Sequence, residues 1–190
     1  EEVLMLTSAF FVSVLSIFTL QYSAFLVCNK HPGCGVNLPD QNLDPSDRYN
    51  ASGECRSLYN ELSAYFMMNP DITFKAQHAV DAYGAQHSGG ITKNITNAFS
   101  LIGLYLTIEH GYTGRQVQLA HMELAKKTIQ WPTLDLPTKH YSLTVADVLK
   151  AEKESNRKEM LMKWAKHVWD TWERHHEWTR NIYASYLKHY

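Results

Sequence analysis

Ten histidines and three cysteines are the side chains of this sequence best suited to binding a metal. His175 and His176 fall within an aromatic stripe of the last predicted helix, and His121 lies on the inward face of an earlier helix. Neutral imidazole is a good ligand for zinc or iron, and facing helices can bring several such groups to one ion. No H-E-x-x-H pair is present, and semi-buried histidines bonded to a carbonyl or carboxylate are the competing interpretation.

Helices must position these side chains, because apolar residues from position 55 onward recur at three- and four-residue spacing. Alternating strand patterns and hairpin-turn signals are absent. The caps, glycines and prolines predict five helices, over about 52–69, 72–87, 94–109, 113–131 and 144–186. The sequence therefore predicts an all-α helical domain over residues 55–190, which follows a loop or linker over 28–54 that is rich in Pro, Gly, Asn and Asp.

The last of these helices has the strongest periodic signal. Thr144 and Asp147 can form a capping box at its start, and apolar residues follow on one face from Leu161 to Tyr186. All five tryptophans follow residue 130, so we expect an aromatic seam between this helix and the earlier ones.

The charge balance argues against a nucleic-acid partner. With 18 basic and 19 acidic side chains and 12% aromatic residues, the chain is neither a polycation nor a disordered acidic segment. Residues 150–190 contain nine basic and six acidic groups with aromatic residues between them. Those aromatic residues fit a helix core better than a platform for stacking bases.

Residues 3–27 carry no charged side chain, and 18 of these 25 residues are apolar. A helix of that length reaches about 37 Å, enough to cross a hydrocarbon layer of about 30 Å with some tilt. A signal peptide fits less well, because the stretch is too long and Glu1 and Glu2 stand where basic residues are expected. The sequence thus predicts a transmembrane helix in a single-pass membrane protein, with a buried core helix as the alternative and with the orientation in the lipid bilayer left open.

Hydroxyl side chains form a stripe along this segment. Ser8, Ser16, Thr19 and Ser23 fall within about 80° of one another around a helix. Such residues permit close approach and hydrogen bonding, so the stripe is predicted to contact other integral membrane subunits. The alternative is that each hydroxyl bonds to a carbonyl of its own helix.

Six short motifs occur in order between residues 31 and 183. They are H-P-G-C-G at 31–35, A-S-G-E-C at 51–55, D-A-Y-G-A-Q-H at 81–87, L-I-G-L-Y-L at 101–106, T-V-A-D-V at 144–148, and W-A-x-x-V-W at 164–169 followed by H-H at 175–176. Together they resemble an uncharacterised, mostly bacterial family that contains a domain of unknown function, with the patterns C-P-G-C-G, D-x-Y-x-x-Q-H-P and W-A-x-x-V-W…H-H. The resemblance implies a metal site made from the knuckle cysteines and helix histidines, in proteins that lack a membrane helix.

The sequence departs from the family pattern at positions that bear on this site. His31 replaces the first knuckle cysteine, and Ser88 replaces the proline after the Q-H pair. Ser100 and Asn156 stand where the resemblance implies histidines. Histidine can replace cysteine as a zinc ligand, but serine and asparagine are poorer ligands. The resemblance therefore implies an incomplete site, with a remnant of the cysteine knuckle in residues 28–54.

Two functions fit these observations. The sequence favours a non-catalytic accessory subunit, anchored by the single membrane helix, whose helical domain caps a larger membrane complex. The alternative is a membrane-tethered, metal-dependent enzyme that holds zinc or iron in its helical bundle. Its metal ligands would be His31, Cys34, His87 and His175 or His176, with Asp81 as general base.

Overall fold

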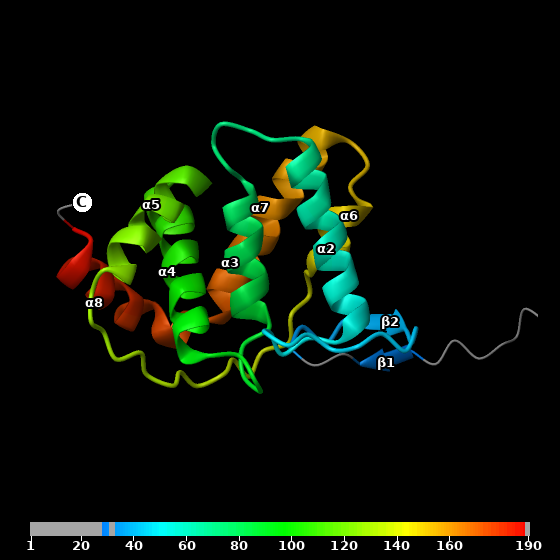
Figure 1. Ribbon diagram of the computed structural model, residues 1–190, viewed down its shortest axis with the longest axis horizontal. Helices are drawn as coiled ribbons and strands as arrows, with labels where there is room; N and C mark the ends of the chain where they lie inside the picture. Colours follow the sequence, from blue (N-terminus) through cyan, green and yellow to red (C-terminus); the bar gives the residue numbers. More distant parts are fainter. Residues whose placement is uncertain (1–27, 31–32, 189–190) are drawn as a thin grey trace, which may run out of the picture.

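The computed structural model describes residues 28–30 and 33–188 of the chain. These residues are mostly helical with almost no strand, which confirms the all-α class, but they form seven α-helices where five were predicted. The helices are α2 (Gly53–Met68), α3 (Ala76–Gln86), α4 (Asn94–His110), α5 (Gly114–Ala125), α6 (Val145–Lys150), α7 (Glu154–Thr171) and α8 (His176–Tyr186), with a 3₁₀ turn, η2 (Glu173–His175), before α8 (Figure 1).

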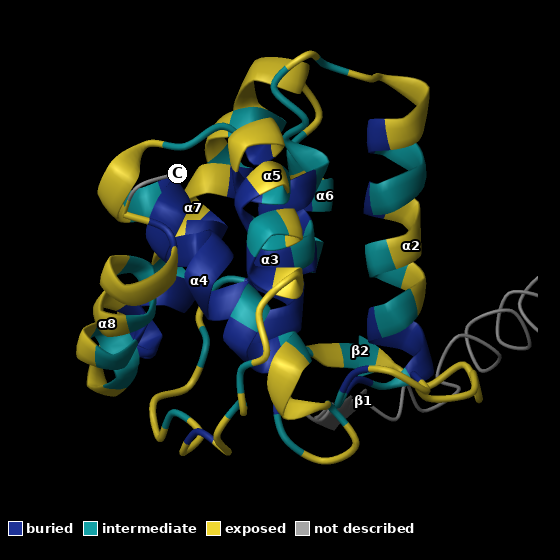
Figure 2. Ribbon diagram, turned by 60° about the vertical axis from the view of Figure 1, so that its left-hand side comes forward, coloured by how far each residue is buried: buried dark blue, intermediate teal, exposed yellow. Residues whose placement is uncertain are grey.

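Helix α3 lies at the centre of the bundle and contacts α2, α4, α5 and α7. Figure 2 shows the buried residues of α3, α4 and α7 gathered on their facing sides. Small residues allow the close packing, because a Cβ added at Gly84 would collide with Ser100 of α4, and one at Gly103 of α4 would collide with Asp81. Any polar side chain on α3 must therefore find its partner inside the protein.

Local capping signals set the helix ends that the sequence predicted best. Ser52 caps α2, and its hydroxyl accepts a hydrogen bond from the Cys55 N–H at 3.2 Å. Thr113 and Gln116 form the predicted capping box of α5. Gly111 ends α4 in the left-handed conformation, with φ of 67°, which an L-residue with a side chain rarely adopts.

The predicted helix over 144–186 is wrong as a single element, since the chain forms α6, α7 and α8 there. Ala151 adopts an extended conformation between α6 and α7. The second break follows Thr171, where the Trp169 carbonyl accepts hydrogen bonds from the Trp172 N–H at 2.9 Å and from His176 Nε2 at 2.9 Å. These bonds replace the ladder bond that a continuous helix would make, and the chain turns to α8.

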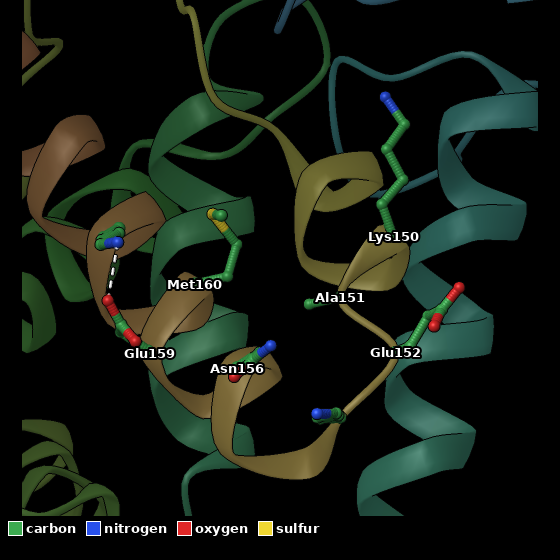
Figure 3. A pocket seen from close by; sticks show the side chains of 8 residues that line it. Lys150, Ala151, Glu152, Asn156, Glu159 and Met160 are labelled. Atoms are coloured by element: carbon green, nitrogen blue, oxygen red, sulfur yellow. Dashed lines mark ion pairs between the residues drawn. The ribbon is translucent and has the colours of Figure 1, made fainter.

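The break before α7 leaves a hollow of about 520 Å³ on the surface between α6 and α7 (Figure 3). Figure 3 shows the charged side chains around it, including Lys150, Glu152 and Glu159. Glu159 pairs with Lys163 at 2.7 Å, and both side chains are more than half exposed. Solvent already satisfies these groups, so the hollow has the character of a hydrated surface. Asn156, where the resemblance implies a histidine, lines this hollow.

The segment predicted as a loop or linker over 28–54 contains a small two-stranded sheet. Strand β1 (Cys28–Lys30) pairs antiparallel with β2 (Asn37–Pro39), with Asn29 opposite Leu38. The chain then runs without regular structure to Ser52, where the Ala51 carbonyl accepts a hydrogen bond from the Ser46 N–H at 3.0 Å. Figure 1 shows this sheet beside the start of α2, and Cys34 lies in the connection between its two strands.

The predicted single-pass membrane location must be corrected. Among residues 28–30 and 33–188, no helix has both the length and the apolar character that crossing a bilayer requires. The predicted transmembrane helix over 3–27, with its stripe of Ser8, Ser16, Thr19 and Ser23, lies outside the residues that the structure describes.

Gln86 provides a test of how the central helix is held. Its side-chain carbonyl accepts from Trp164 Nε1 at 3.0 Å, and its amide donates to the Leu143 carbonyl at 2.7 Å. Gln86 therefore joins α3 to α7 and to the loop before α6. We expect Gln86→Ala to lower the unfolding free energy by about 2–4 kcal/mol, because the buried indole N–H loses its partner and a cavity forms. Urea denaturation measures this.

The matched control is Gln118→Ala, which removes a surface hydrogen bond with Arg115. This control should change the unfolding free energy by less than about 0.5 kcal/mol. Equal effects of the two substitutions would contradict the assigned role of Gln86.

Candidate metal centre

Three buried side chains from separate segments meet below the N-terminus of α2. Cys34 lies in the turn between β1 and β2, Cys55 in the first turn of α2, and His87 directly after α3. Their exposed fractions are 3%, 0% and 0%, and their ligand atoms all lie within 4.8 Å of one another. In the described part of the chain, no other group of three or more such side chains meets this spacing.

Backbone geometry brings Cys34 to the other two residues. Gly33 has φ of 78°, a conformation that favours glycine. A Cβ at this position would approach the Asn50 carbonyl to 2.5 Å and His87 Cδ2 to 2.7 Å. The turn can therefore lie against His87 only with glycine at position 33.

The distances within the cluster are short. Cys34 Sγ lies 3.7 Å from Cys55 Sγ, and Cys55 Sγ lies 3.2 Å from His87 Nε2. Two sulfurs bound to one tetrahedral zinc ion at about 2.3 Å each lie about 3.8 Å apart. The two cysteines thus have the separation that a shared zinc ion requires.

The imidazole of His87 is oriented as a metal ligand. Its Nδ1 lies 2.9 Å from the Tyr83 carbonyl, which can only accept a hydrogen bond, so Nδ1 carries the proton. Nε2 then presents its lone pair toward Cys55 Sγ. A backbone carbonyl on the distal nitrogen is the usual partner of a metal-binding histidine.

Two further donors face the sulfur atoms. The Val36 N–H donates to Cys34 Sγ at 3.5 Å, and the Tyr83 hydroxyl donates to Cys55 Sγ at 3.8 Å. The Tyr83 ring also lies against the His87 ring, with centroids 4.0 Å apart. Such contacts stabilise negative charge on sulfur and hold the ligands in place.

The two thiols differ in the direction in which their pKa is shifted. A hydrogen bond from Cys55 lowers the pKa of Cys34 to about 4, although burial raises it, and His87 adds to the lowering. The same hydrogen bond raises the pKa of Cys55, as does burial. These opposite shifts favour Cys34 over Cys55 as the thiolate, which is the form that binds a metal ion.

The structure brings together only some of the predicted ligands. Cys34 and His87 meet, whereas His31 lies outside the described residues. His175 Nε2 instead bonds the Asp135 carbonyl at 2.9 Å. His176 stacks on Trp169, with centroids 3.7 Å apart. Metal binding by these residues stays a prediction.

Sequence reasoning did not place Cys55 among the ligands. Its signal was present in the A-S-G-E-C motif, where the Ser52 cap sets Cys55 in the first turn of a helix.

The departure from the family pattern at position 88 is accommodated, since the Ser88 hydroxyl donates to Asn97 Oδ1 at 2.8 Å. Ser100, the other departure on this side of the bundle, lines a separate cavity beside Asp81.

Asp81, the predicted general base, lies outside the cluster. Its carboxyl packs against Gly103 of α4, and its Oδ1 accepts a hydrogen bond from Gln77 Nε2 at 3.0 Å. Complete burial raises its pKa well above the usual value for an aspartate. Because Asp81 is not among the side chains that meet at Cys34, Cys55 and His87, the geometry does not support the predicted role.

Comparison with known proteins gives one finding. The model of a family of unknown function (DUF5946) matches residues 29–173. No curated protein and no solved structure matches the chain. Cys34, Cys55 and His87 all lie within the matched region.

The raised pKa of Asp81 predicts how stability depends on pH. Because the folded state keeps this proton after the unfolded chain has lost it, stability should fall as pH rises above about 4. The slope contributed by this carboxyl is about 1.4 kcal/mol per pH unit until the folded-state carboxyl ionises. Asp81→Asn should remove this contribution, so its stability relative to the parent should increase from pH 4 to pH 7.

Urea unfolding at several pH values measures this difference. Glu61→Gln, the same chemical change on the exposed face of α2, is the control and should give a pH-independent difference. If Asp81→Asn also gives a constant difference, then the aspartate is not protonated in the folded protein.

Proposed function

The chain belongs to the DUF5946 family of unknown function, and we propose that Cys34, Cys55 and His87 make this member a zinc-binding helical protein. The observation that carries the proposal is the Sγ–Sγ distance of 3.7 Å in a cluster completed by an imidazole nitrogen. That distance matches the separation of about 3.8 Å that tetrahedral zinc imposes.

Ligand chemistry favours zinc over the other metals. Two thiolates and one imidazole form a soft, nitrogen-containing set, which suits Zn²⁺ and excludes hard ions such as Mg²⁺ and Ca²⁺. Ferrous iron accepts the same ligands but binds less tightly in the usual order of divalent metals. Zinc is therefore the expected occupant, and iron is the alternative that metal analysis distinguishes.

The ion would join three segments that are separated in the sequence. Cys34 belongs to the β1–β2 turn, Cys55 to α2, and His87 to the end of the central helix α3. A metal that binds only the folded arrangement adds its binding free energy to stability. We infer that zinc holds the N-terminal sheet and α2 against the bundle.

A second function, metal-dependent catalysis, is favoured by a cavity next to the cluster. The cavity holds about 130 Å³ and is lined by Gly33, Gln86 and Ser88, which are sequence neighbours of the ligands, and by Tyr141 and Trp172. Three protein ligands with a fourth position open to water is the pattern of catalytic zinc sites.

Zinc stoichiometry tests the first proposal. The full-length protein should bind one equivalent of zinc, and Cys55→Ser or His87→Ala should weaken binding at least about 100-fold because each removes a ligand. Competition with a chromogenic chelator measures the affinity. His175→Ala and His176→Ala remove predicted ligands that lie elsewhere, and these substitutions should leave the zinc affinity unchanged. Tight binding that survives loss of Cys55 or His87 would contradict this site.

Cobalt substitution tests whether the fourth position is open. Co²⁺ bound by two thiolates should give intense thiolate-to-cobalt absorption, and its visible bands report coordination. If water occupies the fourth position, added azide should shift those bands at millimolar concentration, in the parent and in His31→Ala alike. If azide leaves the visible bands of the parent unchanged but shifts those of His31→Ala, the site is closed and structural, which would count against catalysis.

A further inference from the structure

A second cavity, of about 380 Å³, lies between α3, α4 and α5. This volume falls in the range of small-molecule sites, at its lower end. Tyr49 lines the cavity on one side and contacts the Tyr83 ring edge-on, with centroids 5.3 Å apart. Tyr83 in turn contacts His87, so aromatic rings stand between this cavity and the zinc cluster.

Two buried polar atoms without partners belong to residues that line this cavity. Within the described residues, three buried side-chain nitrogen or oxygen atoms lack a hydrogen-bond partner, and two of them are Asp81 Oδ2 and His121 Nε2. An unsatisfied buried polar atom costs about 1–3 kcal/mol and is rare in folded proteins. Their occurrence around one cavity indicates that a polar ligand supplies the missing bonds.

His121 Nε2 is suited to accept a hydrogen bond from such a ligand, and Asp81 Oδ2 can accept one when its carboxyl is ionised. The His121 ring is hydrogen-bonded by the backbone of Phe99 in a way that favours its protonated form, as a carbonyl acceptor does. Since Nε2 is the atom without a partner, Nδ1 makes this bond and Nε2 keeps its lone pair. Asp81 accepts from Gln77 at Oδ1, and its Oδ2, which lies against Gly103 of α4, has no partner among the described residues.

The mouth of the cavity carries a positive charge, opposite in sign to an ionised Asp81. Arg48 is exposed, lines the cavity and lies over the Tyr49 ring at 5.2 Å. It forms no ion pair with any described residue, so its guanidinium can bind a carboxylate. Between the two polar ends, the walls include the apolar side chains of Val80, Ile95 and Phe99.

We propose that this cavity binds a small zwitterion of the amino-acid type, with its amino group toward Asp81 and His121 and its carboxylate toward Arg48. The ammonium group of the zwitterion supplies three N–H donors, and it forms a buried ion pair with Asp81 when the carboxyl releases its proton to solvent on binding. The apolar walls receive the aliphatic part of the molecule. The residues that line this site are different from the three ligands of the zinc cluster.

The probes are the twenty L-amino acids. Each is tested singly against the zinc-loaded protein, first by thermal shift and then by calorimetry. At least one should bind with a dissociation constant of millimolar or below. Its N-acetyl derivative, which lacks the ammonium group, and the corresponding primary amine, which lacks the carboxylate, should each bind at least about tenfold more weakly.

Substitutions locate the site. Asp81→Asn, His121→Phe and Arg48→Met should each weaken binding of that amino acid at least about tenfold. Glu61→Gln and Arg174→Met make matched changes at exposed positions away from the cavity, and they should bind as the parent does. Arg48 is exposed, so its variant keeps the test valid even if a core substitution unfolds the protein.

Three results overturn the proposal. The first is that none of the twenty amino acids binds. The second is that the N-acetyl derivative binds as well as the parent amino acid, which would show that the amino group is not recognised. The third is binding that persists in Arg48→Met and in the folded variants of Asp81 and His121.

Discussion

The burial of helix α3 on most of its surface is the constraint on which the rest of the structure depends. A helix in this position can carry polar side chains only if each finds a partner inside the protein. His78 meets the Thr107 hydroxyl at 3.0 Å, Gln86 meets Trp164, and His87 meets Cys55. These pairs fix how α4, α7 and α2 sit around α3. Asp81 is the exception, with one oxygen unpaired, and it marks the cavity where the internal bonding is incomplete.

The two proposed sites lie along this one helix and are linked by aromatic contacts. Tyr83 stacks on Tyr59, with centroids 4.0 Å apart, and touches both His87 on the cluster side and Tyr49 on the cavity side. Its hydroxyl faces Cys55. A metal that fixes the His87 ring therefore also fixes the ring next to it, and through that ring the wall of the cavity. The stack supplies a continuous path of packed groups between the sites.

Local signals in the sequence predicted much of the fold, and long-range contacts account for what they missed. Ser52 and the Thr113–Gln116 capping box set helix starts from a few neighbouring residues, which a sequence shows directly. The breaks around Ala151 and Trp172 depend on packing and on a histidine that bonds a carbonyl seven residues earlier. The periodic pattern of apolar residues continues across both breaks and therefore did not predict them. The Cys55–His87 contact spans 32 residues. Motifs pointed to cysteines and histidines, but only tertiary structure shows which of them meet.

Charge explains why a metal suits a cluster that excludes water. A lone thiolate in an apolar interior is costly, and the hydrogen bond between Cys34 and Cys55 lowers that cost. Zn²⁺ with two thiolates and a neutral imidazole has no net charge, so replacing the proton by the ion leaves no uncompensated charge in the low-dielectric site. A neutral fourth ligand, whether water or imidazole, keeps that balance, whereas a third cysteine would make the complex an anion. Histidine at position 31, where the resemblance implies a cysteine, therefore keeps the charge balance of a buried metal. The two sulfur atoms already stand at the separation that the ion needs, which lowers the reorganisation that binding requires.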